Sequence, residues 1–146
     1  MKLSAKGRYG LASMICLAQE YGKDDYITIV SISEKLGVSK IYLEQVFALL
    51  KRANLVESTK GSSGGYQLAT SPKNITVYDI LSAIEQSLFE KSKKSLSDSA
   101  SNIENAIGEL VLDRIDEAIL KVINSVTLYD LCEKANSADN NLMYYI

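Results

Sequence analysis

The sequence has no histidine or tryptophan, and only two cysteines and one proline among 146 residues. Without histidine, Cys16 and Cys132 alone cannot build a tetrahedral zinc site, a catalytic triad or a Cys–His dyad. The glycine fingerprints of nucleotide-binding loops are also missing. These absences favour a binding protein without a metal or other cofactor over an enzyme.

Long apolar runs are missing too. No uninterrupted run reaches the ~20 residues that a membrane-spanning helix needs, although 47% of the residues are hydrophobic. The basic start is not followed by the apolar segment of a signal peptide, because Lys23, Asp24 and Asp25 interrupt it. We therefore expect a soluble, cytoplasmic protein with one core.

Charge is divided unevenly along the chain. Residues 1–74 hold ten Lys and Arg against six Asp and Glu, a net charge of +4, whereas residues 75–146 hold six against twelve, a net charge of −6. A basic front and an acidic back fit a protein that presents one end to phosphates, although an ordinary solvated surface explains the asymmetry about equally well.

Apolar spacing predicts a buried helix from about Lys6 to Tyr21, ending before Gly22. Cys16 lies within this run, so a packed thiol is favoured over a redox switch. The next segment, residues 26–29, is short and apolar enough to pair briefly as a strand.

Two further helices form a predicted helix-turn-helix. The first spans about Val30 to Leu36, Gly37 interrupts it, and Ser39 is a plausible N-cap for the second. The second helix places Leu43, Val46, Phe47 and Leu50 on its inner face, and Lys40, Tyr42, Glu44, Gln45, Ala48 and Lys51 on its outer face. Helical bundles with no DNA role share this pattern. Helix spacing alone therefore supports a DNA-binding unit and an ordinary helical bundle about equally.

A hairpin follows. Residues 55–59 and 66–69 are expected to form strands, joined by a loop that contains Lys60, Gly61 and Gly64. Small residues let such a loop approach a phosphate backbone or a minor groove, as a wing does. A plain hairpin that tolerates glycine is the alternative.

The second half is predicted to be helical. A helix from Thr76 to about Leu88 precedes a polar loop, residues 91–102, and a long helix from about Ile103 to Val126. The long helix has more apolar surface than a small domain can cover, so a second copy is the simplest partner; packing onto its own domain is the alternative.

The chain ends with a predicted short helix from Thr127 to about Ala135, which begins with a capping pattern. The tail is polar until residues 142–146, which could bind another protein or pack on the dimer. We expect residues 1–74 to form the DNA-binding domain and residues 75–146 a dimerisation and regulatory region.

Three motifs together resemble the Rrf2 family of bacterial winged-helix regulators. They are Lys6-Gly7-Arg8-Tyr9-Gly10, Tyr42-Leu43-Glu44-Gln45 and Lys60-Gly61-x-x-Gly64-Gly65-Tyr66-x-Leu68. The resemblance covers nearly the whole chain. It implies a mainly α fold with a small β-hairpin wing, a winged helix-turn-helix followed by a long dimerisation helix.

The resemblance also implies roles for residues. The candidates for DNA contact are Lys6, Arg8, Ser39, Lys40, Tyr42, Glu44, Gln45, Lys60, Gly61 and Gly64. Ser39, Tyr42, Glu44 and Gln45 would meet the major groove, where a carboxylate accepts a hydrogen bond from the cytosine amino group. Lys6 and Arg8 would contact phosphates. Lys60 stands where many members have arginine, so minor-groove reading is expected to be weaker here.

Some family members hold an iron–sulfur cluster through three cysteines before the long helix, but residues 91–102 contain none. The chain is most similar to cluster-free repressors of cysteine metabolism, which act as homodimers on pseudo-palindromic double-stranded operators and form a complex with cysteine synthase. That enzyme accepts C-terminal peptides ending in isoleucine, and this chain ends Tyr144-Tyr145-Ile146. Two alternatives stay open: a cluster-free regulator answering another signal, and a regulatory subunit that binds the enzyme through its tail.

Overall fold

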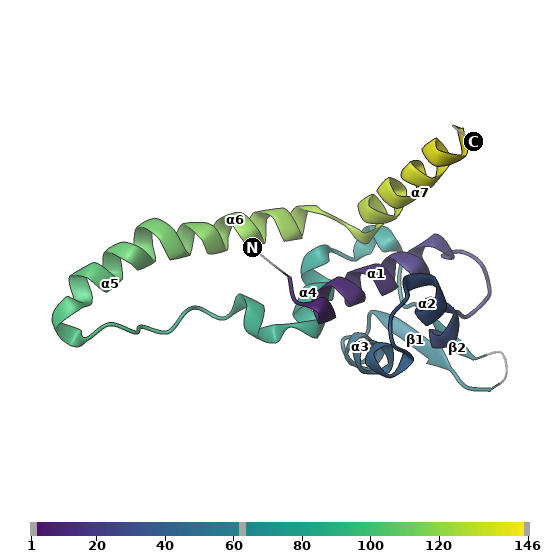
Figure 1. The fold of residues 1–146 in the computed structure, drawn as a ribbon, viewed down its shortest axis with the longest axis horizontal. Coiled ribbons are helices and arrows are strands. Elements are labelled where there is room, and N and C mark those ends of the chain that lie inside the picture. Colours follow the sequence, from purple (N-terminus) through teal and green to yellow (C-terminus); the bar gives the residue numbers. More distant parts are fainter. Residues whose placement is uncertain (1–2, 62–63, 145–146) are drawn as a thin grey trace.

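A computed structural model describes residues 3–61 and 64–144, with side chains through residue 139. Its centre is helix α1 (Ala5–Gln19), against which α3, α4 and α7 pack (Figure 1). Ser4 caps α1, because its hydroxyl accepts a hydrogen bond from the Gly7 amide at 3.1 Å. The predicted buried first helix is confirmed, and Cys16 is buried in it.

The helix-turn-helix consists of α2 (Ile29–Leu36) and α3 (Lys40–Arg52). Thr28 caps α2, and Gly37 ends it with a left-handed backbone at φ 67°. The hydroxyl of Ser39 accepts from the Tyr42 amide at 3.5 Å, as expected of the N-cap of α3. The turn at Gly37 and the cap at Ser39 are confirmed, whereas the cap at Thr28 was not predicted.

An antiparallel hairpin forms the wing. Strands β1 (Val56–Thr59) and β2 (Gly65–Leu68) pair with Val56 opposite Leu68. The brief strand expected at residues 26–29 is reduced to a single bridge between Ile27 and Tyr66, because the chain enters α2 at Ile29. This bridge ties the wing to the helix-turn-helix.

One hydrophobic core joins both halves of the chain. Most of its fully buried side chains come from α1, α2, α3, α4 and the start of α7: Met14, Leu17, Ile32, Leu43, Val46, Phe47, Leu50, Ile80 and Leu128. The predicted inner face of α3 is entirely within it. Burying a side chain of this size contributes about 1.5–3 kcal/mol, so this core fixes the angle at which α3 presents its outer face.

The connection after the wing contains a 3-10 turn (Pro72–Asn74) and α4 (Val77–Ile84), which Thr76 and Asp79 open with reciprocal capping hydrogen bonds. The predicted extension of this helix to Leu88 is wrong. The backbone leaves helical geometry at Glu85, with φ −127° and ψ 73°, and continues as a 3-10 turn over Gln86–Phe89. Another 3-10 turn (Asp98–Ala100) precedes the long helix.

The long helix comprises α5 (Ser101–Ile107), a π-helical segment (Gly108–Leu112) and α6 (Asp113–Ser125). It extends well beyond the domain formed by α1–α4 (Figure 1). None of its residues is buried in the single chain. Ile119 and Ile123 are half-buried where α6 contacts α4, whereas most other large apolar side chains of the long helix are exposed in this copy.

Helix α7 (Leu128–Tyr144) returns the chain to the domain. The predicted capping arrangement is present: Thr127 and Asp130 exchange hydrogen bonds of 3.0 and 3.1 Å. The helix does not stop near Ala135 as predicted. Within the described ranges, no helix is long and apolar enough to cross a membrane.

Candidate nucleic-acid interface

The outer face of α3 carries the residues expected in a major groove. Ser39, Lys40, Glu44 and Gln45 are all exposed. Because the opposite face is locked in the core, this polar face cannot rotate inward. The structure thus displays these four candidates on one accessible surface.

Lys40 and Glu44 form an ion pair one helical turn apart. Lys40 Nζ lies 3.9 Å from a Glu44 carboxylate oxygen, and both side chains are about half exposed. Such an exposed pair contributes less than about 1 kcal/mol to stability. The pair places the positive charge of Lys40 beside the Glu44 carboxylate on the outer face of α3.

Tyr42 is less accessible than its neighbours. Its ring stands nearly perpendicular to that of Tyr9 on α1, at an interplanar angle of 86°, and the ring centroids are 5.3 Å apart. Tyr42 is only half-buried, so part of its edge stays accessible. The pair connects the first and second sequence motifs directly.

The start of α1 adds positive charge. Arg8 is exposed and Lys6 is half-buried. Lys6 and Ser4 line a shallow hollow together with Arg52 from the end of α3, and Glu85 adds a carboxylate to it. Arg52 was not among the sequence candidates, because only the fold brings the end of α3 to the start of α1.

The structure describes Lys60, Gly61 and Gly64 of the wing loop. Lys60 and Gly61 are exposed, and Gly61 has φ 111°, a region that favours glycine. The Gly64 amide donates to the Gly61 carbonyl at 3.0 Å, and a Cβ on Gly64 would lie 2.6 Å from the Thr59 carbonyl oxygen. Glycine is therefore sterically required at Gly64, and the loop has little side-chain bulk between Lys60 and β2.

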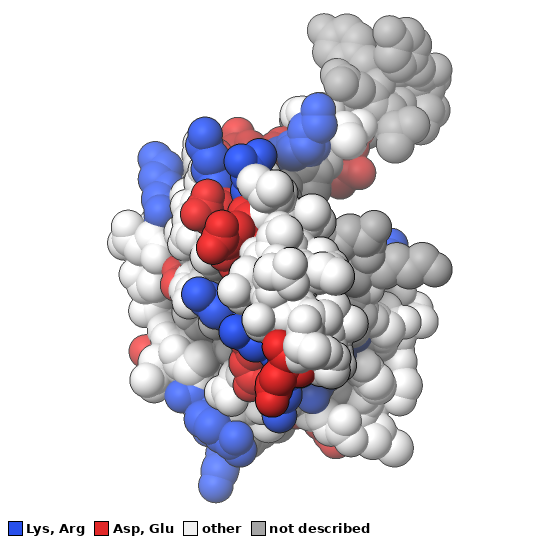
Figure 2. Space-filling model, turned by 90° about the vertical axis from the view of Figure 1, so that its left-hand side faces the viewer, with Lys and Arg blue, Asp and Glu red and all other residues white. Residues whose placement is uncertain are grey.

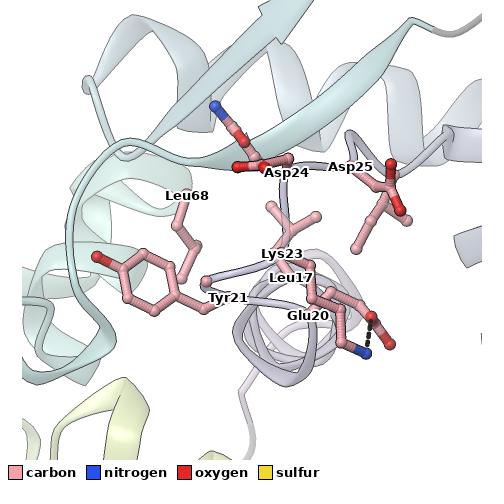
Figure 3. A pocket seen from close by; sticks show the side chains of 10 residues that line it. Leu17, Glu20, Tyr21, Lys23, Asp24, Asp25 and Leu68 are labelled. Atoms are coloured by element: carbon pink, nitrogen blue, oxygen red, sulfur yellow. Dashed lines mark hydrogen bonds and ion pairs between the residues drawn. The ribbon is translucent and has the colours of Figure 1, made fainter.

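Negative charge gathers at the other end of α1. The turn after α1 exposes Asp24 and Asp25 beside a small hollow, and Glu20 pairs with Lys23 at 2.6 Å (Figure 3). The face in Figure 2 mixes acidic and basic side chains with broad uncharged areas. Neither the turn after α1 nor the face in Figure 2 forms a basic patch of the kind that binds DNA. The positive charge available for DNA phosphates therefore lies at the start of α1, on α3 and on the wing.

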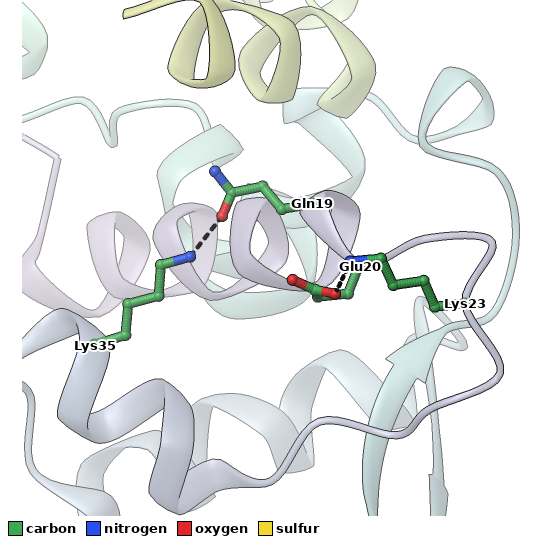
Figure 4. A network of polar contacts seen from close by, with 4 residues as sticks. All are labelled: Gln19, Glu20, Lys23 and Lys35. Carbon is green, nitrogen blue, oxygen red and sulfur yellow. Dashed lines mark hydrogen bonds and ion pairs between the residues drawn. The ribbon is translucent and has the colours of Figure 1, made fainter. Parts of the chain in front are cut away.

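A chain of polar contacts links α2 to α7 through the end of α1. Lys35 Nζ donates to Gln19 Oε1 at 2.7 Å (Figure 4), and Gln19 Nε2 donates to Asn136 Oδ1 at 3.1 Å. Asn136 Nδ2 in turn donates to Cys132 Sγ at 3.7 Å. The helix-turn-helix and the C-terminal helix are thereby joined by side chains.

Both cysteines are buried free thiols. Burial raises the pKa of Cys16, and Lys35 offsets this only in part. Burial and Glu133 raise the pKa of Cys132, against the hydrogen bond from Asn136 and the charge of Lys35. A raised pKa disfavours the reactive thiolate, which agrees with a packing role for Cys16.

The helix-turn-helix, its exposed polar face and the glycine-rich wing define the class of winged-helix DNA-binding transcription regulators. The chain belongs to the Rrf2 family: it matches that family's model, described as an iron-dependent transcriptional regulator, over residues 3–134. The match includes all ten candidate DNA contacts. It stops before the C-terminal tail.

Similar proteins and solved structures are also transcription regulators. The chain is 38% identical over 146 residues, all of both chains, to the HTH-type transcriptional regulator CymR of Bacillus subtilis. It is 40% identical over 90 residues, 60% of this chain and 57% of the relative, to the regulator IscR of Cereibacter sphaeroides. The solved structure of CymR, titled the global cysteine regulator of B. subtilis, has a TM-score of 0.75 at 35% identity and covers 92% of this chain and 98% of that chain. That of T. potens IscR has a TM-score of 0.72 at 36% identity, covering 94% and 90%.

The iron implied by the family description does not fit the residues of this chain. Among the described residues, no three His, Cys, Asp or Glu gather where they could hold a metal ion. The exposed loop before the long helix supplies no thiol, and Cys16 and Cys132 are buried in the core. Soft thiolate ligands of the kind that iron–sulfur clusters require are therefore missing from the expected place.

Proposed function

We propose that the protein is a homodimeric repressor that binds a pseudo-palindromic operator and regulates genes of sulfur or cysteine metabolism under the control of a protein partner. The observation that carries DNA reading is the exposed polar face of α3, held rigidly by the core and flanked by α1 and the wing. The alternative is an Rrf2 regulator that answers another signal.

Each candidate DNA contact has a role that its chemistry suits. Glu44 accepts from a cytosine amino group, Gln45 pairs with adenine, and Ser39 and Tyr42 add hydrogen bonds at the groove edge. Phosphates are bound by residues on both sides of α3, namely Lys6, Arg8, Lys40 and Lys60, with Gly61 and Gly64 allowing the wing to approach.

Dimerisation rests on the long helix. Its exposed apolar stripe consists of Ile103, Ile107, Leu110, Val111, Ile115 and Val122, whereas Leu120 lines a hollow beside α4 of the same chain. A second copy with the same stripe covers this surface by a self-complementary two-fold contact.

The regulated pathway is inferred from relatives. CymR of B. subtilis is described as the global cysteine regulator of that organism, and its similarity extends over the whole of this chain. This similarity supports sulfur or cysteine metabolism as the regulated pathway. Within this proposal, residues 1–74 bind DNA and residues 75–146 serve dimerisation and signal input.

The proposed partner is cysteine synthase, bound through Tyr144, Tyr145 and Ile146. Residues 145 and 146 lie outside the described part of the chain, as does the side chain of Tyr144. Support comes from the sequence, whose last five residues are apolar and end in isoleucine. Deleting Tyr145 and Ile146 should abolish capture of purified cysteine synthase while operator binding is retained. Unchanged capture would refute the tail as the contact.

A second candidate function, favoured by the same apolar end, is that of an enzyme's regulatory subunit. It differs from repression in one measurable respect. If regulation of the enzyme is the main role, adding the protein changes cysteine synthase turnover at equimolar ratio without any DNA present. An unchanged turnover leaves repression as the function.

DNA reading is tested by selecting preferred duplexes from a random-sequence pool. We expect a pseudo-palindrome whose binding weakens steeply with salt, because several phosphates are neutralised. Glu44→Ala should reduce discrimination at cytosine positions more than it reduces affinity for nonspecific DNA. Glu133→Ala, which removes an exposed carboxylate from α7, serves as the control. An unenriched pool would contradict the proposal.

Dimerisation is tested by sedimentation of Val111→Glu, which places a charge in the apolar stripe. It should shift the protein toward monomer and weaken operator binding, since two linked half-sites become separate ones. Glu117→Gln, on the exposed side of the same helix, should stay dimeric. A monomeric wild-type protein at micromolar concentration would overturn this part of the proposal.

A further inference from the structure

Ile41 is the most exposed large hydrophobic residue among those described, with 71% of its surface accessible. Most other exposed aliphatic residues lie on the long helix, where a second copy accounts for them. Ile41 instead lies in the first turn of α3. Nothing within the domain explains an uncovered isoleucine there.

The position of Ile41 places it on the reading face. With a helical repeat of 3.6 residues, Ile41 shares a side of α3 with Glu44 and Gln45, and Ala48 follows on the next turn. All four are exposed, whereas the residues on the opposite side are fully buried. The first turn of a recognition helix is the part that reaches furthest into the groove.

The natural contact for an aliphatic side chain in a major groove is the C5-methyl of thymine. It is the only methyl group among the major-groove edges of the four bases. We propose that Ile41 is a specificity-determining residue that packs on a thymine methyl group beside the bases read by Glu44 and Gln45. This inference rests on the proposed function, since it requires sequence-specific binding through α3.

Uracil in place of thymine removes the methyl group and leaves every hydrogen bond unchanged. The probe is the duplex enriched from a random pool, with each thymine replaced singly by deoxyuridine and titrated at fixed salt. For the wild-type protein, one thymine in each half-site should be sensitive, with an affinity loss of about three- to fivefold for one buried methyl. Adding a methyl to a cytosine at that position, as 5-methylcytosine, should recover part of the loss seen on T-to-C exchange.

The variant Ile41→Ser should lose this sensitivity and bind the thymine and uracil duplexes equally. Because Ile41 is exposed, the variant should melt close to wild type, which thermal unfolding checks. Val30→Ser, which alters a 47% exposed aliphatic residue on α2, should keep the discrimination.

The outcomes separate the two ideas. Enriched duplexes that bind equally with thymine and uracil, or an Ile41→Ser protein that still discriminates, would overturn the role of Ile41 and leave the repressor proposal standing. A pool without any enrichment would overturn both.

Discussion

The rings of Tyr9 and Tyr42 meet nearly at right angles, at a centroid distance of 5.3 Å. This contact holds the first turn of α3 against α1. Tyr42, which is expected to meet DNA, is thus positioned by Tyr9, which belongs to the first sequence motif. An aromatic pair of this geometry contributes about 0.5–1.5 kcal/mol beyond the area it buries. Positioning of α3 therefore depends on the start of α1 as well as on the core.

Replacing Tyr9 should weaken operator binding without removing any DNA contact. Tyr9→Leu is expected to lower operator affinity by about two- to tenfold, which corresponds to the lost aromatic term, while Tyr9→Phe keeps the ring and stays near wild type. Fluorescence anisotropy with the enriched duplex measures both. Equal affinity of the leucine variant would show that the ring pair does not position α3.

Gly65 lets the wing lie close to the segment before α2. A Cβ at this position would collide with the Ile27 carbonyl oxygen and would lie 2.6 Å from its carbonyl carbon. Because both are backbone atoms, Gly65→Ala must displace the bridge between Ile27 and Tyr66, and we expect a loss of about 1–3 kcal/mol in the free energy of unfolding. Denaturant titration measures it.

Gly108 provides the matched control for that variant. It is helical, and a Cβ there would meet nothing within 4 Å. Gly108→Ala should therefore raise stability by about 0.5–1 kcal/mol. A Gly65→Ala protein as stable as wild type would contradict the close approach of the wing.

Ser13 carries a polar group into the core. Its side chain is fully buried, and its hydroxyl has no hydrogen-bond partner among the described residues. Ser13→Ala should raise the free energy of unfolding by about 1 kcal/mol, since the desolvation cost of the hydroxyl is removed. A destabilised alanine variant in thermal melts would show that the hydroxyl makes a bond in solution.

Burial should make the two cysteines slow to react. Because burial raises the pKa of Cys16 and of Cys132, their thiolate fractions at pH 8 lie below those of exposed cysteines, and labelling should accelerate only at higher pH. A thiol-reactive disulfide reagent should modify both residues promptly in guanidinium and slowly without it. Rapid labelling of the native protein would instead support a redox role.

Sequence periodicity predicted most of the fold. The inner face of α3, the cap at Thr127 and the glycine at the end of α2 were all readable from the sequence, because local propensity and packing agree there. The tail was not. Residues beyond Ala135 are rich in Asn, Ser and Asp, which have low helix propensity, and a hydrogen bond from the distant Gln19 to Asn136 supports the helix.

The candidate site was predicted in part for a similar reason. The outer-face position of Glu44 and Gln45 follows from helical spacing and their candidate role from the family resemblance, whereas Arg52 lies beside Lys6 only through tertiary packing. Ile41 escaped notice because an aliphatic residue on a polar face carries no motif; its exposure became evident only in three dimensions.

The central claim is that α3 reads base edges in the major groove, and methylation interference tests it most directly. Dimethyl sulfate modifies guanine N7 in the major groove and adenine N3 in the minor groove. We predict that methylated guanine N7 within two half-sites, spaced by one helical turn or a whole multiple of it, blocks binding to the enriched duplex. Interference by adenine N3 alone would contradict the account.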